Sequence, residues 1–375
     1  MGITLSKRVV AAVAGAAIAA GVQALAPRAG AAGTAAVAAS PEPAVAVAQD
    51  AVGPAGQAAA ARYWTPARIW AALEAANDGG PTAADTAAKP RKLVATPGGR
   101  LRRLVRKAPP ASSARGPWLT GDTAGDGLRW TRAGAAAAAV GKVFFTLGGQ
   151  DYVCSGTLVG GADADGADPD VVLTAAHCVT NGDIAGRAMR WATNWMFIPA
   201  FSDGKFPYGE YTARRFFADP DWTGPQGGRE QYDVAFVQVT AATADRSGGP
   251  VLSGATDQAA PPRGLPVQFA SSQDTLPATR AYVFGYPAEP PYSGQDLNFC
   301  AGRAAAAGGS VSTACAMTAG DSGGPWLAGF SPASGSGRVV AVTTYKLSDN
   351  LRVLYGAVLG PQARALYQQA VKSAG

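Results

Sequence analysis

From Val140 onward the chain is divided into short apolar stretches of strand length, each bounded by Gly, Pro or Asp. This pattern is typical of antiparallel β-sandwiches and barrels, because short strands need tight turns between them. The stretches cover residues 143–147, 152–159, 171–174, 195–198, 234–239, 281–284, 339–344 and 351–358. Only residues 360–372 have a helical pattern, with Pro361 at the start and Ala365, Leu366 and Val371 on one face. We therefore predict an all-β domain over residues 140–375 with a C-terminal helix.

The first 139 residues differ from this domain in composition. Residues 1–26 resemble a secretory signal, since Lys7 and Arg8 precede a short apolar run and small residues suited to cleavage. A membrane anchor is the alternative, but the run is too short and too rich in alanine to span a bilayer comfortably. Residues 27–139 are rich in Ala, Gly and Pro, and we assign them to a low-complexity leader or propeptide.

Two segments of this leader have a pattern of their own. Thr65 as N-cap and Pro66 at the first helical position predict a short helix. The basic run over residues 100–107 is a solvated linker on one reading and, with its dibasic pairs, a processing site on another. The two readings are compatible.

The net charge of +6 belongs to the N-terminal part of the chain. Residues 1–130 hold 15 Lys and Arg against 7 Asp and Glu, while residues 131–375 hold 17 against 19. Nucleic-acid binding needs a basic face on the working domain, so the nearly neutral remainder argues against it.

Four cysteines fit an oxidising compartment and two disulfides, for which three pairings are possible. We favour the local pairings Cys154–Cys178 and Cys300–Cys315, the first of which would contribute about 3 kcal/mol by closing its loop. A metal site is the rival interpretation. It is disfavoured because the chain has no Cys-x-x-Cys pair, and we expect neither a metal nor a cofactor.

His177 is the only histidine of the chain, and it lies in the string Thr174-Ala175-Ala176-His177-Cys178. Ser322 lies far downstream in Gly320-Asp321-Ser322-Gly323-Gly324-Pro325. A serine hydroxyl is a poor nucleophile near neutral pH unless a base of suitable pKa lies beside it. The two strings together therefore indicate a nucleophilic serine with His177 as its base.

These two blocks, with Asp233-Val234-Ala235-Phe236-Val237 between them, resemble the three catalytic blocks of chymotrypsin-fold (trypsin-like) serine peptidases. Their order and the steps of 56 and 89 residues are similar to those of the family. The long leader with Trp64-Thr65-Pro66 resembles that of secreted bacterial members of the family. The resemblance implies two antiparallel six-stranded β-barrels over the peptidase domain. It also implies that His177, Asp233 and Ser322 form a catalytic triad.

The roles that follow agree with the residue types. Ser322 would attack a carbonyl, His177 would carry its proton to the leaving amine, and Asp233 would hold the imidazole tautomer. The N–H groups of Gly320 and Ser322 would form the oxyanion hole, where one donor is worth about 3 kcal/mol. For Asp233 a surface carboxylate is the alternative, and for Ser322 a turn serine.

Asp321 departs from the family pattern in its surroundings. In trypsin-like zymogens the matching aspartate pairs with a newly freed N-terminus, and Val140-Gly141 resembles such a start only slightly. A steric propeptide is an equally good expectation for the activation mechanism.

By resemblance, Ala316 lies at the base of the primary specificity pocket, and Thr344, Tyr345 and Lys346 line it and pair with substrate backbone. Without an acid at the base, cleavage after Lys or Arg is disfavoured. Lys346 would either favour acidic side chains or reach water. We predict a preference for apolar or small residues.

The carboxylates over residues 163–168 resemble a calcium loop but lack its closing glutamate, so a polar hairpin tip is the favoured interpretation. Taken together, the sequence predicts a secreted, extracellular and monomeric serine endopeptidase, made as a preproprotein, which cleaves protein or peptide substrates through an acyl-enzyme. We expect no membrane association after processing. The alternatives are a non-catalytic binding protein on the same fold and an esterase with the same triad.

Overall fold

The computed structural model describes residues 46–47, 52–78, 123–160, 171–182, 188–224, 229–242, 262–273, 280–347 and 349–372. Residues from Glu42 to the C-terminus form one compact unit. The predicted signal peptide, the basic run over residues 100–107 and the acidic segment over 163–168 lie outside the described residues. In the part of the chain that is described, no helix combines the length and hydrophobicity needed to cross a membrane.

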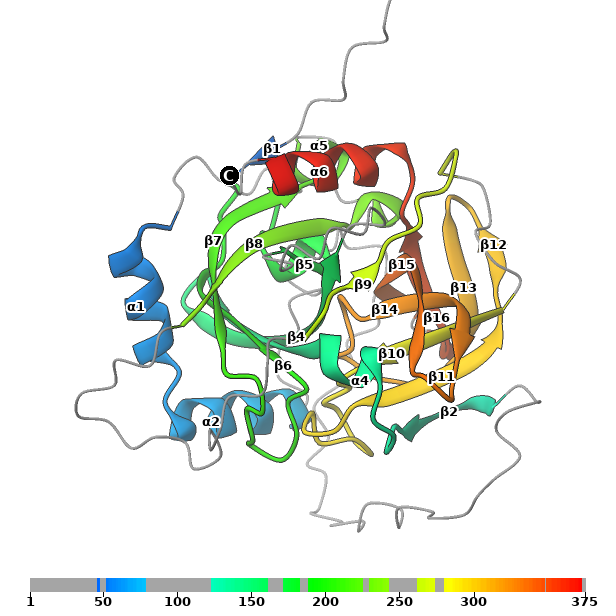
Figure 1. Ribbon diagram of the computed structural model, residues 1–375, viewed down its shortest axis with the longest axis horizontal. Helices are drawn as coiled ribbons and strands as arrows, with labels where there is room; N and C mark the ends of the chain where they lie inside the picture. The colour runs from blue at the N-terminus through cyan, green and yellow to red at the C-terminus, as the bar shows by residue number, and fades with distance from the viewer. Residues whose placement is uncertain are drawn as a thin grey trace, which may run out of the picture. The chain divides into compact units, whose positions relative to one another are not determined.

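Six strands close into a first barrel, in the order β7-β6-β3-β4-β5-β8 with β8 pairing again to β7 (Figure 1). All pairings within this barrel are antiparallel, as the short apolar stretches predicted. The strands are β3 (Val140–Leu147), β4 (Gln150–Gly160), β5 (Val171–Thr174), β6 (Thr193–Pro199), β7 (Tyr211–Ala218) and β8 (Ala235–Ala241). Two short strands join them, β1 (Ala46–Val47) beside β7 and β9 (Leu265–Pro266) parallel to β4.

The second half of the domain is a curled antiparallel sheet of eight strands in the order β12-β13-β16-β15-β14-β10-β11-β2. These strands are β2 (Thr123–Arg129), β10 (Arg280–Gly285), β11 (Asn298–Arg303), β12 (Ala305–Ala307), β13 (Ser310–Ala314), β14 (Pro325–Ser331), β15 (Ser336–Leu347) and β16 (Asn350–Val358).

The predicted second six-stranded barrel is present as a curled sheet that does not close, because β11 and β13 do not pair as a ladder. Strand β2 occupies the free edge of β11, with Phe299 opposite Leu128, so that edge is not available for closure. Instead, the Cys300–Cys315 disulfide and a 2.9 Å hydrogen bond from Thr313 Oγ1 to the Arg303 carbonyl hold the two strands together. The second unit is therefore a half-barrel.

The predicted C-terminal helix is present as α6 (Pro361–Lys372), but its buried face is Ala363, Leu366 and Ala370, and Val371 of the predicted face is exposed. The helix predicted at Thr65 is also present. In α2 (Pro66–Asn77) the Thr65 side chain accepts a hydrogen bond from the Arg68 N–H. A further helix, α1 (Pro54–Tyr63), was not predicted, because its Ala-rich sequence has little hydrophobic periodicity.

The compact fold begins upstream of the composition change at Val140. Strand β2 pairs with β11, and helix α4 (Ala135–Ala139) buries Ala136 and Ala139. Trp130 packs edge-on against Phe284 and Phe299 in the half-barrel. The predicted boundary at 139/140 therefore follows composition and not packing, since small and aromatic residues of the preceding segment contribute to the core.

Candidate active site

His177 and Asp233 meet where strands β5 and β8 lie side by side. His177 lies in a short 3-10 turn (Ala176–Cys178) directly after β5, and Asp233 directly precedes β8. Because Thr174 of β5 pairs with Ala235 of β8, both residues come to the same end of the barrel. The pair is nearly completely buried, and His177 Nδ1 lies 2.7 Å from Asp233 Oδ2. The other carboxylate oxygen accepts the backbone N–H of His177 at 2.9 Å.

Ser322 lies on a tight turn in the half-barrel, directly before β14. Gly320 and Gly323 flank it with φ angles of +98° and +84°, which L side chains rarely adopt. A Cβ at Gly320 would lie 2.8 Å from the Tyr286 carbonyl oxygen, so only glycine fits there. The turn is closed by hydrogen bonds from the Gly324 N–H to the Asp321 carbonyl and from the Gly323 N–H to the Thr343 carbonyl.

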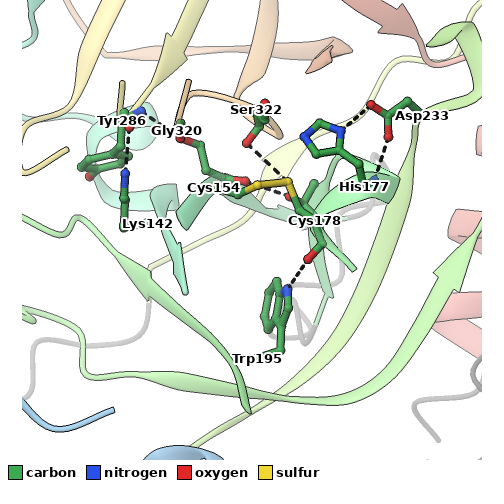
Figure 2. The surroundings of a disulfide bond; sticks show 11 residues. Lys142, Cys154, His177, Cys178, Trp195, Asp233, Tyr286, Gly320 and Ser322 are labelled. Carbon is green, nitrogen blue, oxygen red and sulfur yellow. Dashed lines mark hydrogen bonds and ion pairs between the residues drawn. A yellow bond between two sulfur atoms is a disulfide. The ribbon is translucent and has the colours of Figure 1, made fainter. Parts of the chain in front are cut away.

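Ser155 connects the barrel that carries His177 with the turn that carries Ser322. Its backbone N–H donates to the Ser322 carbonyl at 2.7 Å, and its hydroxyl donates to the Gly320 carbonyl at 2.8 Å. The same hydroxyl accepts the N–H of Tyr286 at 2.8 Å. The Cys154–Cys178 disulfide lies directly beside it, and Figure 2 shows the His177 ring between Asp233 and Ser322. The structure thus brings all three predicted triad residues together, and both predicted disulfides are formed.

The peptide groups on both sides of the turn have fixed orientations. The Ala319 carbonyl accepts the Ala288 N–H at 2.7 Å, and the Asp321 carbonyl accepts the Gly324 N–H at 2.9 Å. Each of these carbonyls shares a peptide group with one of the predicted oxyanion donors, the N–H of Gly320 or of Ser322. Because a peptide group is planar and trans, fixing its carbonyl also fixes the direction of its N–H.

Asp321 is buried beside this turn, and its Oδ2 has no hydrogen-bond partner among the described residues. Burial raises the pKa of Asp321 to about 7, although the charges of Lys346 and Lys142 oppose the shift. Lys142 is equally buried, and its Nζ donates to the Tyr286 carbonyl at 2.8 Å. Burial lowers the pKa of Lys142 to about 7, against the charge of Asp321. The positive charges that act on the Asp321 carboxylate are therefore those of the Lys142 and Lys346 side chains.

The suggested new N-terminus at Val140-Gly141 lies inside the barrel. Val140 pairs with Thr157 of β4, and Gly141 pairs with Gly156 and, on its other side, with Pro199 of β6. Both residues are buried in this arrangement.

The predicted pocket residues lie around the same turn. Ala316 follows the Cys300–Cys315 disulfide and is half-buried. Thr344 is buried, and Tyr345 stacks on Tyr355 with ring centroids 4.7 Å apart. The Lys346 ammonium is held within the protein, because its Nζ donates to the carbonyls of Cys315 at 2.7 Å and Leu351 at 2.5 Å.

Cys154, His177 and Cys178 are the one group of potential metal ligands that comes together among the described residues. Both sulfur atoms belong to the disulfide, so neither can act as a thiolate ligand. A cavity of about 400 Å³ lies nearby and contains none of the predicted site residues; its lining includes Tyr152, Asn181 and Arg190.

Three residues that support this site were not predicted from the sequence. Lys142 carried a signal, since it is the one charge in the otherwise apolar strand over residues 140–147. Ser155 and Asn77 carried none, because their importance comes from backbone groups that are distant in sequence.

A buried His–Asp pair beside a serine on a glycine-rich turn, on this arrangement of strands, defines the site of a serine peptidase. Residues 154–342 match the family model of the trypsin-like peptidase domain, and the chain belongs to this family.

Solved structures agree with this assignment. The protease Anisep from Arthrobacter nicotinovorans is 32% identical with a TM-score of 0.51, over 64% of this chain and 97% of that one. The thermostable serine protease AL20 from an extremophilic microorganism is 27% identical with a TM-score of 0.51, over 64% of this chain and 99% of that one. No curated protein sequence matched the chain significantly.

Proposed function

We propose that this protein is a secreted serine endopeptidase that cleaves peptide bonds through the triad Ser322, His177 and Asp233. The two-point contact between Asp233 and His177 carries the proposal, since it fixes both the ring and its Nδ1 tautomer. Such a contact leaves Nε2 as the proton acceptor, on the side of the ring where Ser322 lies (Figure 2).

In the proposed reaction, Ser322 Oγ bonds to the substrate carbonyl carbon while its proton passes to His177 Nε2. The carbonyl oxygen becomes an oxyanion that accepts hydrogen bonds from the N–H groups of Gly320 and Ser322. The C–N bond then breaks, and His177 gives its proton to the leaving amine. Water attacks the acyl-enzyme by the same route in reverse, which releases the acid and the free serine.

Two features support secretion from the cell. The first 26 residues have the pattern of a signal peptide, and the four cysteines form two disulfides, as in proteins of oxidising compartments. We propose an extracellular monomer without metal or cofactor, released from a precursor by processing of its leader.

For the primary specificity we propose apolar or small side chains. Ala316 places no charge at the predicted pocket base, and the Lys346 ammonium is already held by two carbonyl oxygens. On the side of β14, residues 344–346 extend beyond the last pair of the β14–β15 ladder, Pro325 with Val342, which leaves backbone groups for a substrate strand. A peptide library in which Arg, Lys or Glu dominated at the cleaved position would overturn this specificity.

The test of the main proposal is active-site labelling. Secreted protein is treated with a tagged fluorophosphonate beside a Ser322→Ala variant, and intact masses are read. We expect a shortened wild-type chain with one label and no label on the variant. A correctly processed but unlabelled wild-type chain would favour the non-catalytic binding protein instead. Turnover of esters without turnover of peptides would favour the esterase.

A further inference from the structure

Asn77, the last residue of helix α2, lies against the loop that orients the predicted oxyanion hole. Its Nδ2 donates to the carbonyl oxygens of Ala288 at 2.9 Å and Tyr292 at 2.7 Å. Because both partners are acceptors, the NH₂ end of the amide must face them, and both of its hydrogens are used. Asn77 thereby joins two points of the loop over residues 286–294.

The same loop contacts the oxyanion segment on its other side. The Ala288 N–H donates to the Ala319 carbonyl at 2.7 Å. Next to it, the Thr318 hydroxyl bonds to both backbone groups of Glu289, at 3.1 Å from the N–H and 3.0 Å to the carbonyl. Ala288 is therefore bonded on both sides. Its carbonyl accepts a hydrogen bond from Asn77, and its N–H fixes the peptide group between Ala319 and Gly320.

The loop is tightly packed against Gly320 at Ala288. Ala288 is completely buried, and a Cβ on Gly320 would lie 2.9 Å from the Ala288 Cβ and 3.0 Å from its nitrogen. A displacement of Ala288 is thus transmitted directly to Gly320, because close-packed atoms cannot absorb it.

Helix α2 is itself fixed to the first barrel. Trp64, Ile69 and Leu73 are buried, and the Trp64 ring packs on Phe144 with centroids 5.4 Å apart. The hydroxyl of Tyr63 donates to Asp151 at 2.9 Å. Asn77 is therefore the end of a rigid support and not the tip of a loose segment.

Residues 52–78, which hold helices α1 and α2, form no hydrogen bond or ion pair with the triad. Outside their own segment, they bond to Asp151, Asn194, Arg214 and the 286–294 loop. A segment that only blocked the substrate site would contact that site instead.

We propose that Asn77 is a positioning residue of this peptidase, which acts through Ala288 to aim the Gly320 N–H at the oxyanion. Helices α1 and α2 then stay bound to the working enzyme after any processing of the leader downstream of them, instead of inhibiting it. This inference rests on the proposed function, and wild-type labelling by fluorophosphonate tests that function separately.

The experiment compares Asn77→Ala with Glu74→Ala, an exposed position on the same helix, in the full secreted protein. A misaimed donor weakens transition-state binding more than substrate binding. We expect Asn77→Ala to lower kcat about tenfold with KM within twofold, less than the 10²- to 10³-fold loss for removal of an oxyanion donor. Glu74→Ala should retain wild-type kcat.

Asn77→Asp and Asn77→Gln complete the series. A carboxylate cannot donate to two carbonyls, so Asn77→Asp should lose at least as much kcat as the alanine variant, whereas Asn77→Gln should recover part of it. Wild-type kcat in folded Asn77→Ala, or higher activity in it, would overturn the proposal. If Asn77→Ala does not fold, Asn77→Asp decides, since a native melting temperature with wild-type kcat in a variant that cannot donate to the two carbonyls would refute the positioning role.

Discussion

At the scale of single residues, the site depends on Asp233 using both carboxylate oxygens. One oxygen holds the backbone of His177 and the other holds its ring, so the carboxylate fixes the imidazole relative to its own main chain. A residue with one acceptor could satisfy only one of these two donors.

This arrangement makes Asp233→Asn a sharp test. The amide must turn its NH₂ either toward the His177 backbone N–H or toward the ring, and in the second case it forces the wrong tautomer. We expect kcat to fall about 10⁴-fold while the fold is retained. Kinetics with a peptide substrate and thermal melting measure both effects.

Asp221→Asn is the matched control, because this side chain is substantially exposed and forms a surface ion pair with Arg229. It should leave kcat unchanged. A loss of less than tenfold for Asp233→Asn would contradict the proposed role of the carboxylate.

Some residues of this site could be predicted from the sequence, and others could not. His177, Asp233 and Ser322 stand in strings whose residue types follow from the chemistry, and the structure brings them together. Ser155 and Asn77 act on carbonyl oxygens that lie 165 or more residues away, such as those of Gly320 and Ala288. Backbone acceptors are present in every residue, so no side-chain pattern marks such partners.

At the scale of secondary structure, the strands predicted correctly from the sequence are those whose residues are mostly apolar. Strands β3, β4, β5 and β8 were found with ends shifted by a few residues at most. Strand β7 was not predicted, because Arg214 and Arg215 interrupt its run of apolar residues. The two strands that pair with it, β6 and β8, were both predicted. Strand β14 was missed since it directly follows a glycine-rich turn, whose signal dominates locally.

The leader helices are expected to contribute to the stability of the folded domain through Trp64. Trp64 is 2% exposed and packs on the first barrel, whereas Trp70 on the outer face of α2 is 38% exposed. Trp64→Ala should lower the free energy of unfolding by about 3–5 kcal/mol, the usual cost of removing a buried Trp.

Trp70→Ala removes the same side chain from the surface and should cost far less. Urea denaturation of the full secreted protein measures both values. Equal small effects would mean that the helices are not part of the cooperative fold.

At the scale of the whole molecule, the site exists only where two differently built halves meet. The closed barrel supplies His177 and Asp233, and the half-barrel supplies Ser322 and the proposed oxyanion donors. Buried polar contacts cross this boundary, from Ser155 to Gly320 and from Lys142 to Tyr286. The open second unit was not predictable from its strands, because the segment that blocks its closure comes from a glycine-rich stretch before Val140.

This boundary also contains a buried acid and a buried base, from which a pH dependence follows. Asp321 has a pKa raised from 3.8 to about 7, so the folded protein keeps a proton there that the unfolded chain releases. Its contribution to stability is complete below pH 4 and is lost as the pH rises through 7. Lys142 has a pKa lowered from 10.5 to about 7. Its contribution is complete above pH 10.5 and is lost as the pH falls through 7.

Because the two contributions oppose each other, this pair should give the free energy of unfolding a minimum near pH 7. The fall in the free energy of unfolding below pH 7 and the rise above it each amount to roughly 4–5 kcal/mol at most, since one pKa unit corresponds to 1.36 kcal/mol. Lys142→Met should remove the rise above pH 7 and, by deleting a cation that stabilises ionised Asp321, extend the fall to higher pH. Lys205→Met, at an exposed lysine, should leave the profile unchanged. Urea denaturation at pH 5, 7 and 9 distinguishes these outcomes. If wild type and Lys142→Met gave parallel profiles, neither the loss of the Lys142 proton nor its charge would influence stability in this range, which would contradict the predicted coupling to Asp321.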